Sequence, residues 1–179
     1  MTDVKDSKLK EMLIGYAAAH QHPLNVFVHL IGIPVIMLGV CIPLSWGVFR
    51  IGGFEITLAH AAAIGLFAFY LSLDAVFALV FLAIGLAVAE AAVIIGDLPR
   101  STALIVAAAA FFGGYLLQFV GHAIERSMPV LIKHPIQANL AAPFFVVVEL
   151  FSLVGLRQSL FAEVQEAVKE RRQQEVLSH

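Results

Sequence analysis

The chain has 179 residues, of which 60% are hydrophobic and only 13% are charged. This apolar excess excludes a soluble globular protein and indicates an integral membrane protein. The formal net charge of −2, with 11 Lys and Arg in total, provides no broad basic surface, so nucleic acid is excluded as a partner.

The N-terminal segment, residues 1–20, is predicted to be an amphipathic helix. Its apolar side chains recur at helical spacing and end at Leu13 and Tyr16,. His20 lies four residues after Tyr16, so we expect its ring on the same face, toward protein or membrane. The sequence "HPLN" then predicts a turn in which Asn25 caps the first spanning helix.

Four apolar segments are long enough to cross a bilayer, for which a helix needs about 20 residues. They cover residues 26–48, 56–73, 74–96 and 101–121. The second and third form one apolar stretch interrupted at "YLSLD", which predicts a helical hairpin with Asp74 as an N-cap. Short loops are expected at 49–55 and 96–100, because these segments hold Gly, Pro and charged residues.

A fifth apolar stretch, residues 139–156, is short and contains Pro143 and Glu149. We expect it to be interfacial or re-entrant, at one end of the bundle. Residues 158–175 are predicted to form a C-terminal amphipathic helix. The whole chain, residues 1–179, is therefore predicted to be a single all-α membrane domain with four spanning helices across 26–121.

Basic residues are concentrated outside the predicted spans. Only Arg50 and Arg100 fall in the loops after the first and third spans. The others precede the first span or follow the fourth: Lys5, Lys8, Lys10, Arg126, Lys133, Arg157, Lys169, Arg171 and Arg172. The positive-inside rule then places both termini in the cytoplasm. The membrane would be the inner membrane in a bacterium and the endoplasmic reticulum in a eukaryote.

Several ionisable side chains are predicted to meet at the cytoplasmic end of the bundle. His29 lies one turn inside the first span, at the same depth as His20. Gln118, His122 and Glu125 follow the spacing i, i+4, i+7 and so project from one face of the fourth span. Because ionisable groups inside a membrane are costly, three histidines at one depth indicate a functional site.

The residue types at this end favour a metal site. Cys41 is the only cysteine, so a metal would be held by His and carboxylate, a donor set that suits zinc or non-haem iron(II). Glu125 is equally consistent with a metal role and with a partnership to Arg126. Glu149 is expected either to ligate the metal or to orient a ligating histidine. His60 falls near the opposite membrane face and is excluded from the site.

Two sequence signatures that would specify the chemistry are absent. The chain contains neither HExxH nor the clustered histidine boxes of membrane desaturases, which argues against a zinc protease and a di-iron desaturase. Gln118 is expected to be a hydrogen-bond partner rather than a ligand. His22 and His134, in polar connections, are expected to be ordinary interfacial residues.

Three blocks of the sequence, "YAAAHQHPLNVFVHLIGIP", "QFVGHAIERSMPVLI" and "AAPFFVVVEL", closely resemble the iron(II)-dependent 2-hydroxy fatty acid dioxygenase family. The resemblance spans residues 8–156. It rests on Tyr16, His20, Pro23, Asn25, His29, Pro34, Gln118, Gly121, His122, Glu125, Pro129, Pro143 and Glu149. One departure is "LIKHP" at 131–135, where the family tends to read "LIDNL", and it bears on substrate range more than on the metal.

The resemblance implies fatty acid α-oxidation, in which a 2-hydroxy fatty acid and O₂ give a fatty acid shortened by one carbon. It implies iron(II) at His20, His29 and His122, with Glu125, Glu149 and Gln118 in catalytic or supporting roles. We expect the substrate carboxylate and α-hydroxyl to chelate the iron, the acyl tail to lie among apolar helices in the lipid bilayer, and Arg126 or Lys133 to neutralise the carboxylate.

Other functions remain open from the residues alone. A non-enzymatic transporter or lipid-organising membrane protein would use intramembrane His and Glu for proton relay or packing. A zinc-dependent membrane hydrolase would use the same His and Glu residues. The oligomeric state is also open, and a homo-oligomer is one alternative.

Overall fold

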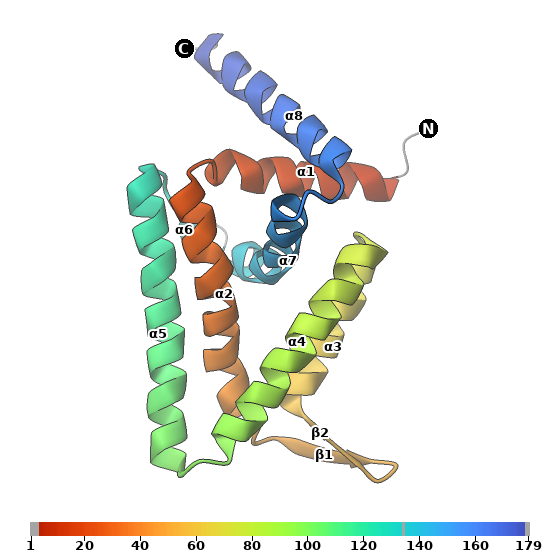
Figure 1. Cartoon of the computed structure of the whole chain (residues 1–179), viewed down its shortest axis with the longest axis vertical. Coiled ribbons are helices and arrows are strands. Elements are labelled where there is room, and N and C mark those ends of the chain that lie inside the picture. The colour runs from red at the N-terminus through yellow and green to blue at the C-terminus, as the bar shows by residue number, and fades with distance from the viewer. Residues whose placement is uncertain (1–3, 134, 178–179) are drawn as a thin grey trace.

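The computed structural model describes residues 4–133 and 135–177, and these are almost entirely helical (Figure 1). The elements in chain order are α1 (Val4–Ala19), α2 (Pro23–Leu44), β1 (Val48–Ile51), β2 (Phe54–Thr57), α3 (Leu58–Leu71), α4 (Ala75–Gly96), α5 (Arg100–Glu125), α6 (Val130–Lys133), α7 (Pro135–Leu153) and α8 (Gln158–Leu177).

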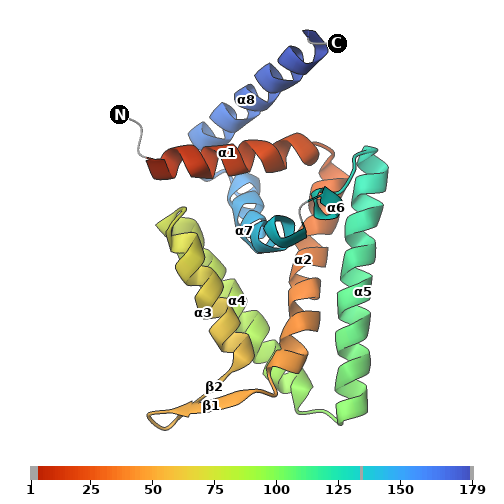
Figure 2. The same ribbon diagram turned by 180° about the vertical axis from the view of Figure 1, so that it is seen from behind.

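Four helices run along the length of the bundle in alternating directions. In Figures 1 and 2, α2, α3, α4 and α5 connect the end where α1 lies with the end where the β-hairpin lies. By length and composition, α2, α4, α5 and α7 are apolar enough to cross a membrane, whereas α3 has only 14 residues. The protein is therefore an all-α, multi-pass membrane bundle, as predicted.

Helix α7 follows a different path from the four long passes. It has 19 residues, yet both views keep it in the half of the bundle next to α1 (Figures 1 and 2). Residues 143–148 are all buried, so protein surrounds the helix on every side at this point,. Hydrogen bonds from Tyr70 Oη to the Leu140 carbonyl and from Tyr115 Oη to Asn139 Oδ1, both 2.6 Å, fix its first turns. The prediction of an interfacial or re-entrant segment stays a prediction, because α7 is also among the helices long and apolar enough to cross a membrane.

Some predicted boundaries were wrong. Helix α2 begins at Pro23 with His22 as its N-cap, whose Nδ1 accepts from Leu24 N–H at 3.2 Å, so Asn25 is not the cap. The segment expected to be a loop at 49–55 belongs to the antiparallel hairpin β1–β2. Helix α5 continues four residues beyond the predicted end of the fourth span, to Glu125. The predicted N-cap at Asp74 is confirmed, because its Oδ1 accepts from Val76 N–H and Phe77 N–H.

Small residues bring α2 and α5 into close contact. A Cβ on Gly114 would lie 2.9 Å from the Gly32 carbonyl oxygen, and a Cβ on Gly39 would lie 2.6 Å from Phe111 N. A Cβ on Gly121 would overlap the side-chain oxygen of Asn25. A Cβ on the neighbouring Gly113, by contrast, would have nothing within 4 Å. Close backbone packing of this kind is typical of membrane helices that associate without a hydrophobic driving force.

The amphipathic helices α1 and α8 lie together at one end of the bundle (Figure 1). Leu9 and Leu13 of α1 and Val164 of α8 are buried in the same apolar cluster. An ion pair joins Lys10 Nζ to Glu163 Oε2 at 2.5 Å. Both terminal helices therefore lie on the same side of the bundle, as an even number of passes requires.

Candidate metal centre

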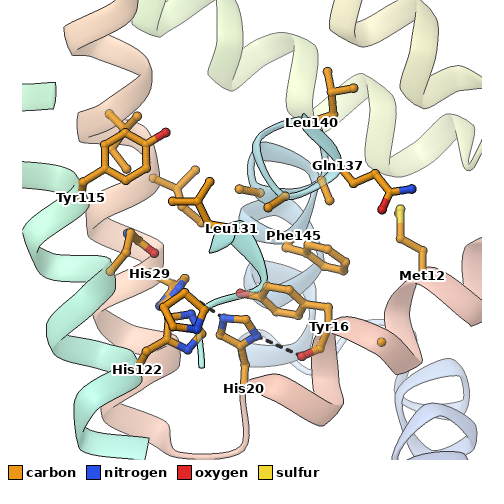
Figure 3. Close-up of a pocket in the computed structure, with 18 of the residues that line it drawn as sticks. Met12, Tyr16, His20, His29, Tyr115, His122, Leu131, Gln137, Leu140 and Phe145 are labelled. Carbon is orange, nitrogen blue, oxygen red and sulfur yellow. Dashed lines mark hydrogen bonds between the residues drawn. The ribbon is translucent and has the colours of Figure 1, made fainter. Parts of the chain in front are cut away.

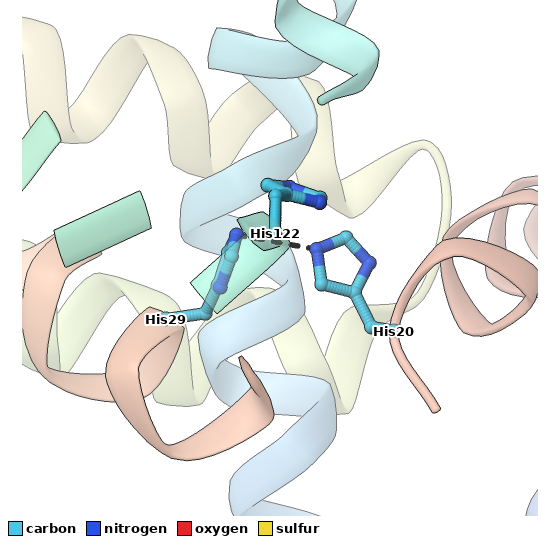
Figure 4. Close-up of side chains that lie close together, drawn as sticks. All are labelled: His20, His29 and His122. Atoms are coloured by element: carbon cyan, nitrogen blue, oxygen red, sulfur yellow. Dashed lines mark hydrogen bonds between the residues drawn. The ribbon is translucent and has the colours of Figure 1, made fainter. Parts of the chain in front are cut away.

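Three buried imidazoles from three separate segments meet beneath α1. His20 follows the end of α1, His29 lies on the second turn of α2, and His122 lies on the last turn of α5. Their ring centroids are 4.5 to 5.0 Å apart, and each ring offers one nitrogen within 4.8 Å of the other two. Figure 4 shows the three rings turned toward a common point. Among the described residues, these three histidines form the candidate group for holding a metal.

Each ring is held by a hydrogen bond on Nδ1, here called its outer nitrogen; the other ring nitrogen, Nε2, is its inner nitrogen. His20 Nδ1 lies 3.0 Å from the Tyr16 carbonyl, and His29 Nδ1 lies 2.9 Å from the Asn25 carbonyl. Because a carbonyl only accepts, both Nδ1 atoms carry the proton. His122 Nδ1 lies 2.9 Å from Ser127 Oγ. In metal sites such outer bonds fix the tautomer and turn the other nitrogen toward the ion.

The inner nitrogens have the spacing and the lone pairs that a cation site requires. His20 Nε2 and His29 Nε2 are 3.2 Å apart, and in the neutral tautomers both present lone pairs. Two facing lone pairs repel unless a proton or a metal ion lies with them. Burial, followed by the charge of His29, lowers the pKa of His20 from 6.5 to about 3, so protonation is unfavourable near neutral pH. Three neutral imidazole nitrogens form a donor set suited to zinc, copper, iron or nickel.

Tyr16 supports the site from α1. Its ring stacks on His20 with centroids 3.9 Å apart and on Phe145 of α7 with centroids 3.6 Å apart. Burial, together with the negative charges of Glu149 and Glu125, raises the pKa of Tyr16 far above its ordinary value. Tyr16 is therefore a neutral, rigid support for the His20 ring, and it connects that ring to α7.

Glu125 ties the loop before α2 to the end of α5. Its Oε1 accepts from Gln21 N–H at 2.6 Å, and its Oε2 accepts from the Asn25 side-chain amide. Asn25 is the residue whose carbonyl orients His29. The carboxylate is thus engaged in positioning His20 and His29, and it does not belong to the three-histidine group.

The end of α5 folds back to bring Ser127 to His122. Arg126 adopts a left-handed backbone conformation with φ of 55°, and Ser127 N–H donates to the His122 carbonyl at 3.0 Å. This pattern is typical of helix C-termini. Arg126, predicted to bind substrate, has an exposed side chain and does not line the cavity described below.

A largely apolar cavity of about 670 Å³ opens from the histidines. Its volume lies within the range of small-molecule sites, about 300–1,000 Å³. Figure 3 shows the histidines gathered in one part of the cavity, with Tyr115 of α5 and Leu140 of α7 away from them. Ile33 and Ile36 of α2 also line it. The cavity therefore joins a polar nitrogen cluster to an apolar channel.

The other predicted site residues have different places. Gln118 lines the cavity. Glu149 is half-buried on α7 and acts on Tyr16 by its charge, but it does not line the cavity. The side chain of Lys133 and the whole of His134 lie outside the described part of the chain. His60, which the sequence excluded from the site, bonds Glu90 at 3.0 Å near the hairpin end.

Sequence reasoning missed the residues that orient the histidines. Ser127 lies beyond the helix end, five residues after His122, where helical periodicity carries no information. Asn25 links His29 to Glu125 instead of capping α2. The Phe145 contact to Tyr16 joins helices distant in sequence, and no local pattern predicts it.

Comparison with known proteins gives a family and a distant relative. Residues 7–153 match the family model described as Mpo1-like, 2-hydroxy-palmitic acid dioxygenase Mpo1-like. The chain is 27% identical over 159 residues to the protein named 2-hydroxy-palmitic acid dioxygenase MPO1 of Saccharomyces cerevisiae, covering 88% of this chain and 87% of that protein. No solved structure matches the chain. Since the family model covers most of the sequence, including all three clustered histidines, this chain belongs to the Mpo1-like family.

Proposed function

We propose that this protein is an iron(II)-dependent dioxygenase that shortens 2-hydroxy fatty acids by one carbon at the membrane interface. The observation that carries the proposal is the convergence of three buried imidazoles, each with its outer nitrogen occupied and its inner nitrogen available. The family and the yeast relative, both named for 2-hydroxy-palmitic acid dioxygenase, supply the reaction class.

The shape of the cavity suits an amphiphilic substrate. Its polar part lies at His20, His29 and His122, whereas the wall beyond them is mainly apolar and includes Ile33 and Ile36. A fatty acid has the same division, because the head group prefers polar partners and the acyl tail prefers apolar ones. We place the head at the histidines and the tail along α2 and α5.

The overall reaction balances with O₂ as the sole oxidant: R–CH(OH)–COOH + O₂ gives R–COOH, CO₂ and H₂O. Iron(II), when bound, supplies a centre that accepts both oxygen-donor ligands and O₂. His20, His29 and His122 would hold it, with their inner nitrogens deprotonated. Tyr16, Glu125 and Ser127 keep these rings in place. The apolar wall excludes water from the tail side of the site.

Oxygen uptake with a metal count tests the proposal. We expect protein purified without oxygen or chelators to contain one iron per chain, and to consume O₂ and form pentadecanoate from 2-hydroxypalmitate. His29→Ala and His122→Ala should remove both iron and turnover, whereas His60→Ala, at the other end of the bundle, should retain both.

Other results would favour the rival functions. Stoichiometric zinc with oxygen-independent hydrolysis would indicate a hydrolase. A metal-free preparation that moves solutes across liposomes would indicate a transporter. Full iron content and activity in His29→Ala would refute the site.

We also propose that both termini face the cytoplasm. The proposal rests on the distribution of basic residues around the passes and on the shared side of α1 and α8,. Cysteines introduced on α8 and in the β1–β2 turn should react with an impermeant maleimide from opposite sides of sealed vesicles. Labelling of α8 from the periplasmic or lumenal side would show that the orientation is the opposite of the proposed one.

A further inference from the structure

Gln118 is a buried polar residue beside the histidines that has no partner for its amide nitrogen. It lies on α5 one turn before His122, is 9% exposed, and lines the same cavity. Its Nε2 makes no hydrogen bond within the described part of the chain. A buried donor without an acceptor costs free energy, so this amide is an exception that requires an explanation.

The surroundings of Gln118 leave room for the amide to turn. Its Nε2 lies against Gly32 of α2, at the place that a Cβ on Gly32 would occupy. The nitrogen and oxygen of the amide are nearly equal in size, so rotation about the last side-chain bond exchanges their positions. Because Gln118 lines the cavity, we infer that after this exchange its N–H donors can face an acceptor on a bound ligand.

The position of Gln118 along the cavity decides which ligand atom it meets. One helical turn, about 6 Å, separates it from His122 in the direction of the far end of the bundle. Farther in the same direction the cavity wall includes Tyr115 and Ile36. Gln118 therefore lies where the polar head of an acyl ligand gives way to its tail.

We propose that Gln118 donates a hydrogen bond to the oxygen on C2 of the bound acid and makes the site select 2-hydroxy acids over unsubstituted fatty acids. This assignment rests on the proposed function. The C2 oxygen is the polar atom nearest the tail, and the carboxylate lies closer to the histidines. A site with a buried donor discriminates against an analogue that lacks the matching oxygen, because the donor is then left unsatisfied.

Binding of a matched pair of acids tests the assignment without turnover. Wild-type protein, Gln118→Met and Gln118→Leu would be loaded with Zn²⁺, which has no redox chemistry, in nanodiscs. Calorimetry would compare 2-hydroxyoctanoate with octanoate, with protein-free nanodiscs correcting for partition into lipid. Zinc content equal to that of the wild type would show that the histidine cluster is intact. Gln165→Met, with an exposed side chain on α8 away from the cavity, is the control substitution.

We expect wild-type protein to prefer 2-hydroxyoctanoate. Gln118→Met should weaken its binding by about tenfold, the effect of one hydrogen bond, and should leave octanoate binding nearly unchanged. Gln165→Met should keep the wild-type preference. Equal losses of affinity for both acids, or an unchanged preference in both Gln118 variants, would overturn the assignment of Gln118. Neither result would contradict the proposed dioxygenase function. A zinc-loaded wild type that binds neither acid would instead refute the proposed function itself.

Discussion

Replacing Glu125 tests whether its carboxylate positions the histidines or ligates the metal. Glu125→Ala removes the acceptor of Gln21 N–H at 2.6 Å and of the Asn25 amide. Asn25 is fully buried, and its Oδ1 has no partner among the described residues, so its whole side-chain amide would lose hydrogen bonding. Bonds to a charged acceptor contribute roughly 1.5–3 kcal/mol each, less where exposed as at Gln21. We expect a loss of about 2–4 kcal/mol of stability.

The same substitution should weaken metal binding 10- to 100-fold, the usual range when a group that supports metal ligands is removed. Glu125→Gln distinguishes the two roles. Its oxygen still accepts from Gln21 N–H, and its amide can donate to Asn25 Oδ1 once the Asn25 amide turns over. A positioning role therefore predicts that Glu125→Gln binds Zn²⁺ nearly as tightly as the wild type.

The Zn²⁺ dissociation constant would be measured by competition with a chromophoric chelator in nanodiscs. Glu90→Gln, which changes the partner of His60 at the hairpin end, is the matched control and should have no effect. If Glu125→Gln loses as much affinity as Glu125→Ala, the carboxylate is a ligand and the reasoning is refuted.

Further substitutions test the helix packing, the outer hydrogen bond of His122 and the protonation of His20. Gly114→Ala places a methyl group 2.9 Å from the Gly32 carbonyl and should cost about 1–3 kcal/mol, whereas Gly113→Ala, with nothing within 4 Å, should be neutral,. Equal unfolding temperatures in detergent would contradict the close α2–α5 contact. Ser127→Ala removes the partner of His122 Nδ1 and should weaken Zn²⁺ binding by about tenfold, with exposed Ser101→Ala as control. The pKa of His20, about 3 in the folded protein against an ordinary 6.5, means that the unfolded chain binds more protons between these values. The contribution of His20 to the stability of the metal-free protein should therefore be lost as the pH falls from 6.5 toward 3, by at most about 1.4 kcal/mol per pH unit. The free energy of unfolding at pH 7 and pH 5 measures this slope. If His20→Gln has the same slope as the wild type, the slope arises from other groups.

Much of the fold follows from apolar length and turn chemistry. Long apolar runs predicted the helical passes, and the acidic side chain after "YLSL" predicted the α3–α4 turn at Asp74, because both signals are local. The β1–β2 hairpin was missed although its signal is also local. Gly52 and Gly53 have φ of 57° and 87°, and a Gly-Gly pair flanked by apolar residues is typical of a two-residue hairpin turn. The glycines together with the charges of Arg50 and Glu55, which pair across the strands, favour a loop when the segment is considered alone.

The site could be predicted in residue type and depth but not in its hydrogen bonds. Counting passes brings His20, His29 and His122 to one end, since topology alone sets the depth. The acceptors that orient His20 and His29 are backbone carbonyls, which are the same in every sequence and leave no pattern. Glu125 was considered as a ligand or as the partner of Arg126, because its actual partners lie about a hundred residues earlier in the chain.

The three clustered histidines differ in how firmly the fold holds them. His29 and His122 lie on α2 and α5, whose backbones touch at Gly32 and Gly114, so their separation is set by a rigid helix pair. His20 follows the end of α1 and depends on the Tyr16 stack and on the Glu125 contact to Gln21. Helix α1 also supplies Met12, Gly15 and Tyr16 to the cavity wall. An ion bound by all three histidines would therefore fix that wall against the α2–α5 pair, so metal binding and the shape of the cavity would depend on the same loop.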